Sequence, residues 1–231
     1  TLFRSEDRRF FRHAGVDIQG VMRAFVATYV KKGATQGGSS LTQQYVKNVL
    51  LLQAQEDNDP IAEYHASEET VARKLREMLI AVQMEKTYSK LEILQGYLNI
   101  AQFGRGIYGV EMAARRYFST TADKLDIVQA ATIAAITKNP AAFDPSVESN
   151  QKASQRERNI VLDLMYQEKY ISQKQRDEAK AKPLKDTLKL QDAQAGCSAS
   201  GDAAFFCDYV TKKILNSKEF GKTIEERKKL L

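Results

Sequence analysis

The 231-residue sequence predicts a mainly α protein, and three observations lead to this prediction. Apolar residues recur at helical spacing through most of the chain, which is typical of helices with one apolar face. Only four residues are prolines, so few positions interrupt a helix. Strand-like alternation is almost absent between residues 90 and 181. With 43% hydrophobic residues, we expect one well-buried domain with an appended segment.

The first expected helix covers residues 17–33 and is amphipathic and basic. Its apolar stripe consists of Ile18, Val21, Met22, Phe25 and Tyr29, with Arg23, Lys31 and Lys32 off the stripe. Such a stripe either packs on the core of a protein or lies in a lipid interface. The sequence leaves both interpretations open.

The second expected helix begins at Ser40 and ends at about Leu51. Ser40 and Gln43 fit the capping box, in which the two side chains satisfy each other's backbone N–H groups. The stretch from Gln53 to Thr70 then holds six acidic residues and neither Lys nor Arg. We interpret this stretch as an exposed loop.

The third expected helix runs from about Val71 to Lys86 and is apolar nearly all round, which predicts a central, buried helix. One stripe consists of Val71, Leu75, Met78, Leu79 and Val82. Arg73, Lys74 and Glu77 share another face, so we expect Glu77 in or beside the interior with two cations one turn away. The alternative is a surface ion pair worth only about 0.2–0.5 kcal/mol.

Five further helices are expected at residues 90–101, 110–118, 125–137, 154–170 and 172–181. Beyond Pro183 the composition changes to small residues, which predicts a domain at 1–185 and a separate segment at 186–231. Two cysteines, Cys197 and Cys207, flank a small-residue loop. They form either a disulfide or two buried thiols.

The net charge of +6 and the pI near 9.1 favour an anionic partner. No aromatic and basic RNA-binding run occurs, so no nucleic acid is expected. The pattern Gly104-x-Gly106-x-x-Gly109 matches a dinucleotide motif, but it follows a helical segment and not a strand, so we interpret it as a tight loop. P-loop, HExxH and CxxC patterns are missing, and we expect no organic cofactor.

Two carboxylates stand out, Glu6 near the start of the chain and Glu77 on the third expected helix. A carboxylate within hydrogen-bond reach of a hydroxyl can act as a general base. Between them, Gly37-Gly38 precedes the helix that begins at Ser40, and the free N–H groups at such a helix start suit a phosphate. Together these features indicate transfer from a phosphate-activated donor.

The ordered motifs resemble those of the peptidoglycan glycosyltransferases, glycosyltransferase family 51, found in class A penicillin-binding proteins and monofunctional transglycosylases. Glu6 to Gly15 resembles the first motif. Gly37 to Gln44 with Lys47-Asn48 resembles the second, and Arg73 to Glu77 resembles the third. Residues 97–118 resemble the fourth motif and 126–145 the fifth. The acidic stretch from Gln53 to Thr70 is longer than the family's usual connection.

The resemblance implies a mainly α, lysozyme-like domain with a small membrane-associating subdomain between the first and third motifs. It implies that lipid II is polymerised into β-1,4 glycan strands, with inversion at the donor anomeric carbon and release of polyprenyl pyrophosphate. Glu6 would be the general base for the acceptor 4-hydroxyl. Glu77 would act at the donor pyrophosphate, directly or through a divalent cation such as Mg or Mn. The substrate-binding residues would be Asp7, Ser39, Gln43, Lys47, Arg73 and Lys74, with Asp7 supporting the orientation of the first motif.

The resemblance also implies partners and a location. The partners are lipid II, the growing glycan strand, the membrane surface and a fused transpeptidase domain, toward which residues 186–231 would lead as a linker. The sequence begins in a motif without Met, so we expect a piece of a longer protein. An N-terminal transmembrane helix outside this piece would anchor that protein at the outer face of the bacterial cytoplasmic membrane.

Two other functions stay open at this point. A lysozyme-like glycosidase also uses paired carboxylates on either side of a glycosidic bond, although the phosphate-suited helix start argues against it. A noncatalytic module that binds an anionic polymer would also explain the basic charge.

Overall fold

The computed structural model describes residues 7, 9–25, 38–191, 204–228 and 230. The chain divides into two compact units, Thr1–Gln191 and Asp192–Leu231. The prediction of a mainly α fold is confirmed, because the described residues form helices and no strand, with one isolated bridge between Gln102 and Tyr108.

Ten α-helices of the first unit are described: α2 (Ile18–Phe25), α3 (Leu41–Glu56), α4 (Pro60–Ser67), α5 (Val71–Thr87), α6 (Lys90–Ile100), α7 (Val110–Phe118), α8 (Ile127–Ile136), α9 (Gln151–Gln167), α10 (Gln173–Ala181) and α11 (Leu184–Thr187). Short 3-10 helices occur at Phe10–Arg12, Ala122–Lys124 and Glu148–Asn150. The second unit contains α12 (Ala204–Asn216), a 3-10 helix at Lys218–Phe220 and α13 (Ile224–Lys228). The expected helices from residue 90 onward are thus present with small shifts at their ends.

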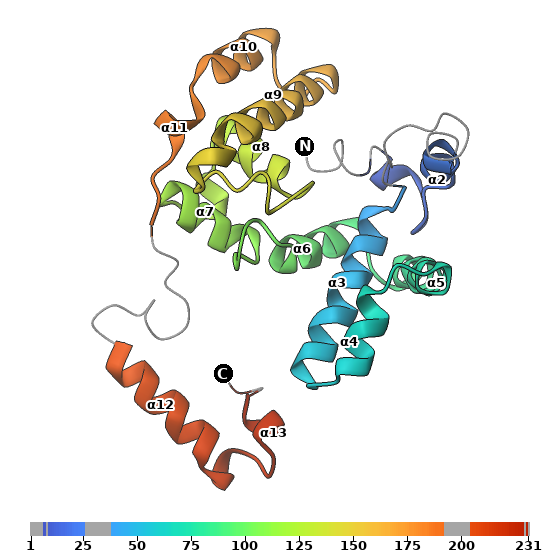
Figure 1. The fold of residues 1–231 in the computed structure, drawn as a ribbon, viewed down its shortest axis with the longest axis vertical. Coiled ribbons are helices and arrows are strands. Elements are labelled where there is room, and N and C mark those ends of the chain that lie inside the picture. Colours follow the sequence, from blue (N-terminus) through green and yellow to red (C-terminus); the bar gives the residue numbers. More distant parts are fainter. Residues whose placement is uncertain (1–6, 8, 26–37, 192–203, 229, 231) are drawn as a thin grey trace. The chain divides into compact units, whose positions relative to one another are not determined.

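The first unit has two groups of helices joined by α6 (Figure 1). Helix α3 packs against α4, α5 and α6, while α8 packs against α7, α9 and α10. The hydrophobic core lies mainly among α6 to α9 and includes Tyr117, Phe118, Ile136 and Leu162, which are fully buried. Because this core is large and continuous, it anchors α6, which in turn supports α3 and the segments around it.

The prediction of an exposed loop between Gln53 and Thr70 is wrong. Helix α3 continues to Glu56, and a separate helix, α4, follows a short turn. Asp59 caps α4 by accepting hydrogen bonds from the backbone N–H groups of Ile61 and Ala62, each at 3.0 Å. Pro60 adds a favourable first helical residue, so the acidic turn begins a helix and does not prevent one.

The predicted orientation of α5 is also wrong in part. Val71 and Leu79 on the expected apolar stripe are 77% and 73% exposed. The buried face carries Arg73, Glu77 and Ala81 instead. Glu77 therefore lies in the interior as expected, but the apolar stripe does not, because α5 turns its charged face toward the rest of the unit.

Helix α2 exposes part of its apolar stripe. Ile18 and Met22 are 73% and 59% exposed, so these two residues do not pack on the core. Val21 is partly buried, and Tyr29 and the side chain of Phe25 lie outside the described residues. The exposure of Ile18 and Met22 favours the lipid-interface interpretation at these two positions.

The first unit ends at Gln191. The backbone N–H groups of Lys189 and Gln191 donate to the carbonyls of Tyr117 and Arg116 at 2.8 and 2.9 Å. These bonds hold the chain to α7 up to Gln191. In the second unit Cys207 is disulfide-bonded, and Cys197, the other cysteine of the chain, lies outside the described residues.

Candidate active site

Asp7 joins the first motif to the start of α3. Its carboxylate is buried, and its Oδ2 accepts a hydrogen bond from the backbone N–H of Leu41 at 3.0 Å. The Nε2 of His13 lies 2.8 Å from the same oxygen. Since Leu41 is the first residue of α3, Asp7 satisfies one of the free N–H groups at a helix start, where a negative charge is favoured. Glu6, the expected general base, precedes Asp7 and lies outside the described residues.

Gly15 holds the other end of the first motif against α5. Its φ of +83° is in the region that favours glycine, and a Cβ there would lie 2.7 Å from the carbonyl carbon and oxygen of Ala81. The Ser40 hydroxyl donates to the Gly15 carbonyl. The first motif is therefore held between the start of α3 and the middle of α5, one turn after Glu77.

The capping box at the start of α3 is present as expected. Ser40 Oγ accepts from the Gln43 N–H at 3.2 Å, and Gln43 Oε1 accepts from the Ser40 N–H at 2.7 Å. Gln43 is fully buried, and its Nε2 has no hydrogen-bond partner among the described residues. The visible function of Gln43 is thus to cap the helix, and its binding of substrate stays a prediction.

Four of the expected site residues come together between α3 and α5. One oxygen of Glu77 accepts from Arg73, and the other lies 2.8 Å from Lys74 Nζ. The same Nζ donates to Ser39 Oγ at 2.9 Å. Lys74 therefore connects the second motif to the third, across a gap of many residues in sequence.

The charges around Glu77 leave the site positive. One carboxylate faces two cations, and Arg73 also donates to the backbone carbonyl of Glu68, which holds its guanidinium in place. The helix dipole of α3 adds partial positive charge at the same end. Such an arrangement suits phosphate oxygens, because charge-assisted hydrogen bonds to phosphate are stronger than neutral ones.

Lys47 lies on α3 one turn after Gln43 and is partly buried. Its amine forms no ion pair or hydrogen bond with any other residue in the described part of the chain. It is therefore available to a ligand, although no contact places it beside Glu77.

A second cluster, which the sequence did not indicate, supports the site from α6. Glu85 Oε1 accepts from Thr42 Oγ1 at 2.5 Å and from Lys90 Nζ at 2.7 Å. Lys90 Nζ also lies 4.5 Å from the centre of the Phe10 ring. These contacts join the first motif, α3, α5 and α6. The spacing of four residues from Glu77 through Ala81 to Glu85 places all three on one face of α5 and is the signal that points to Glu85.

His13 is another residue whose position the sequence did not predict. It lies against Asp7, and its ring packs edge-on to Phe10. It therefore supports the same carboxylate that holds the start of α3.

The described residues around Glu77 do not fit a metal site. Both oxygens of Glu77 already face cations. Within the described ranges, no group of three or more His, Cys, Asp or Glu side chains is arranged to hold a metal ion. The divalent cation expected from the resemblance stays a prediction, and no step below is routed through it.

Comparison with known proteins adds a family to this geometry. The model of the transglycosylase family matches residues 1–166. Penicillin-binding protein 1A of Aquifex aeolicus is 39% identical over 180 residues, which are 78% of this chain and 23% of that protein. Penicillin-binding protein 1A/1B of Bacillus subtilis is 36% identical over 211 residues, which are 91% of this chain and 21% of that protein. The chain thus spans less than a quarter of the length of these relatives.

A crystal structure of penicillin-binding protein 1A from Haemophilus influenzae is also similar, with a TM-score of 0.39 and 20% identity over 78% of this chain and 20% of that one. The family assignment depends on the sequence comparisons, because the family model covers well over half of the chain. The chain therefore belongs to the transglycosylase family, the peptidoglycan glycosyltransferases that its ordered motifs indicate.

Proposed function

We propose that this chain polymerises lipid II into β-1,4 glycan strands and releases polyprenyl pyrophosphate. The observation that carries the proposal is the bridge made by Lys74, whose amine contacts both Ser39 of the second motif and Glu77 of the third. This bridge brings together a helix start, two cations and a buried carboxylate. These are the groups that a reaction with a pyrophosphate leaving group requires.

In the proposed reaction the acceptor 4-hydroxyl attacks the anomeric carbon of the donor and transfers its proton to Glu6. The bond from that carbon to the pyrophosphate oxygen breaks, and the α linkage of the donor becomes a β linkage. Arg73, Lys74 and the start of α3 stabilise the negative charge that develops on the leaving pyrophosphate. Asp7, the sequence neighbour of Glu6, fixes the first motif on α3.

The contacts of Glu77 support an indirect action at the pyrophosphate. Its carboxylate holds Arg73 and Lys74 in place, so its removal would leave two cations without their orienting partner. Both oxygens of Glu77 already accept from cations, so neither is positioned to protonate a leaving group. The contacts therefore favour a transferase over the glycosidase alternative, in which a carboxylic acid must protonate the leaving group.

We also propose that this unit acts at the outer face of the bacterial cytoplasmic membrane, together with a transpeptidase domain of the same protein. Exposed apolar side chains of α2 and α5 support contact with lipid; they are Ile18, Met22, Val71, Leu75 and Leu79. Among the described helices, none has the length and apolar character needed to cross a membrane.

The test is polymer formation from purified lipid II by the chain and its variants. Glu6→Gln removes the proposed base and Glu77→Gln removes the negative charge between the two cations. We expect each variant to lose about 10²-fold or more of the polymerisation rate. Glu178→Gln, a change of an exposed glutamate on α10, is the matched control. Turnover by Glu6→Gln near that of the control would refute the assignment, as would release of soluble muropeptides from sacculi without consumption of lipid II.

A further inference from the structure

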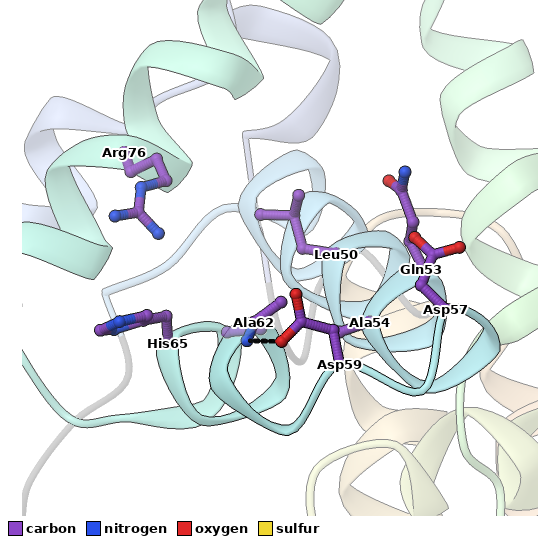
Figure 2. A pocket seen from close by; sticks show the side chains of 9 residues that line it. Leu50, Gln53, Ala54, Asp57, Asp59, Ala62, His65 and Arg76 are labelled. Atoms are coloured by element: carbon purple, nitrogen blue, oxygen red, sulfur yellow. Dashed lines mark hydrogen bonds between the residues drawn. The ribbon is translucent and has the colours of Figure 1, made fainter.

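A pocket of about 360 Å³ lies among α3, α4 and α5, and none of its lining residues is an expected active-site residue (Figure 2). Its volume is within the range of about 300–1,000 Å³ that is usual for small-ligand sites. Most of its lining residues belong to the acidic segment between Gln53 and Thr70. The pocket is therefore a feature of this chain that the proposed polymerisation does not explain.

Small side chains form the floor of the pocket. Ala54 of α3 and Ala66 of α4 line it and are themselves 4% and 7% exposed. With alanine at these two positions the facing helices stay joined, while little side-chain volume fills the space above the contact. Leu50 adds an apolar wall.

Charged side chains of both signs line the same pocket, and within the described ranges they form no ion pair with one another. Arg76 and His65 lie toward one side in Figure 2, and Asp57 lies toward the other, with the Asp59 carboxylate between them. Among the described residues, the side chains of Arg76 and Asp57 form no ion pair or hydrogen bond. Asp59 uses Oδ1 to cap α4.

Other charged groups near this site do not neutralise it. His65 Nδ1 lies 3.2 Å from Glu68 Oε1, which orients the imidazole and leaves its Nε2 for another partner. A lone anion in this pocket would face two carboxylates, and a lone cation would face the Arg76 guanidinium. A ligand that carries both charges avoids both repulsions, because each of its ends meets an opposite charge.

We propose that this pocket binds the phosphoethanolamine headgroup of a membrane lipid. The phosphate contacts Arg76 and His65, since a guanidinium can donate two parallel hydrogen bonds to phosphate oxygens. The ammonium donates its N–H groups to Asp57 and Asp59. A trimethylated ammonium has no N–H group, so phosphocholine lacks these bonds.

The surroundings of the pocket favour a lipid as the source of the headgroup. Ile61 and Tyr64 of α4 are 70% and 63% exposed, and Leu75 of α5 is 56% exposed. Each of these three residues directly precedes a residue that lines the pocket. Apolar side chains exposed next to a polar pocket suit a ligand whose headgroup is polar and whose chains are not.

The first experiment measures binding of the 231-residue chain to phosphatidylcholine vesicles with and without phosphatidylethanolamine at equal total lipid. We expect several-fold tighter binding when phosphatidylethanolamine is present. Arg76→Gln and Asp57→Asn each remove this preference, because one charge-assisted contact is worth roughly tenfold in affinity. Arg156→Gln and Asp186→Asn make the same charge changes at exposed positions outside the pocket, and these two variants keep the preference.

The second experiment separates the lipid from the free headgroup. O-Phosphoethanolamine is titrated into the chain while the backbone amide resonances of Ala54 and Ala62 are followed, and we expect shifts that Arg76→Gln abolishes. If these shifts occur without any preference for phosphatidylethanolamine vesicles, the pocket binds the free zwitterion, and the proposal that its ligand is a membrane lipid is wrong. Equal binding to both kinds of vesicle together with no response to O-phosphoethanolamine overturns the proposal, as does a preference for phosphatidylethanolamine that Arg76→Gln and Asp57→Asn leave unchanged.

Discussion

Substitution of Gly15 by alanine tests whether the first motif is held against the backbone of α5. The φ of Gly15 is +83°, and an added Cβ would lie 2.7 Å from the carbonyl carbon and oxygen of Ala81. Gly106 is the matched control, because its φ is +73° and a Cβ there would meet nothing within 4 Å. The two positions share the backbone cost of alanine and differ in the steric contact.

The expected magnitudes follow from these two terms. Left-handed backbone costs a non-glycine residue about 1–2 kcal/mol at either position. Alanine also lowers the conformational entropy of the unfolded chain, which raises the free energy of unfolding by about 0.4–1 kcal/mol in both variants. Overlap with the helix backbone, which cannot move aside like a side chain, adds about 1–3 kcal/mol for Gly15→Ala alone. The free energy of unfolding should therefore fall by about 1–3 kcal/mol more for Gly15→Ala than for Gly106→Ala.

The assay is urea unfolding followed by helical circular dichroism, since the chain has no tryptophan for fluorescence. With an m value of about 2 kcal/mol per molar urea, the two midpoints should differ by roughly 0.5–1.5 M. Gly15→Ala should also slow glycan polymerisation, because the first motif moves relative to Glu77. Equal midpoints for the two variants would refute the contact between Gly15 and α5.

Three further predictions address the site and the core. Lys74→Met should slow polymerisation by about 10²-fold and change the free energy of unfolding little, since the Lys74 side chain is 39% exposed. Lys86→Met changes an exposed lysine on the same helix. An equal loss of polymerisation rate in that variant would contradict the role of the contacts from Lys74 to Ser39 and Glu77. Asp7→Asn should lower the free energy of unfolding by about 1.5–3 kcal/mol, because the charge-assisted bond from the start of α3 is weakened; unchanged urea midpoints would count against it. Burial raises the pKa of the Tyr117 hydroxyl above its ordinary value of 10.0, so the folded state keeps a proton that the unfolded chain loses. The contribution of this group to the free energy of unfolding is fully present below about pH 10 and declines as the pH rises further. Tyr117→Phe should flatten the decline in urea midpoints measured across this range.

Local features of the sequence predicted the helices well because their causes are local. Capping side chains lie within three residues of the groups that they satisfy, as Ser40 and Gln43 do. The segment from Gln53 to Thr70 is the exception. Its acidic composition suggested a loop, but Asp59 and Pro60 form a helix start that the charge count concealed.

Long-range contacts decided which face of α5 is buried. Periodicity identified an apolar stripe, and an apolar stripe usually faces the core. In this chain Gly15 approaches the backbone at Ala81, and Lys74 reaches Ser39. Both contacts draw the charged face inward. No local pattern around α5 contains this information, because both partners lie far away in the sequence.

The sequence by itself determined the helical class, the order of the motifs and the presence of a carboxylate and two cations on one helix face, since each depends on spacing along the chain. Only the tertiary structure decided that the apolar stripe of α5 stays exposed and that Lys74 also reaches Ser39, next to the start of α3. The physical reason is that burial of a helix face depends on which segments pack against it, and here Gly15 and Ser39 approach the charged face. That packing joins distant segments of the chain, and spacing along one helix does not specify it.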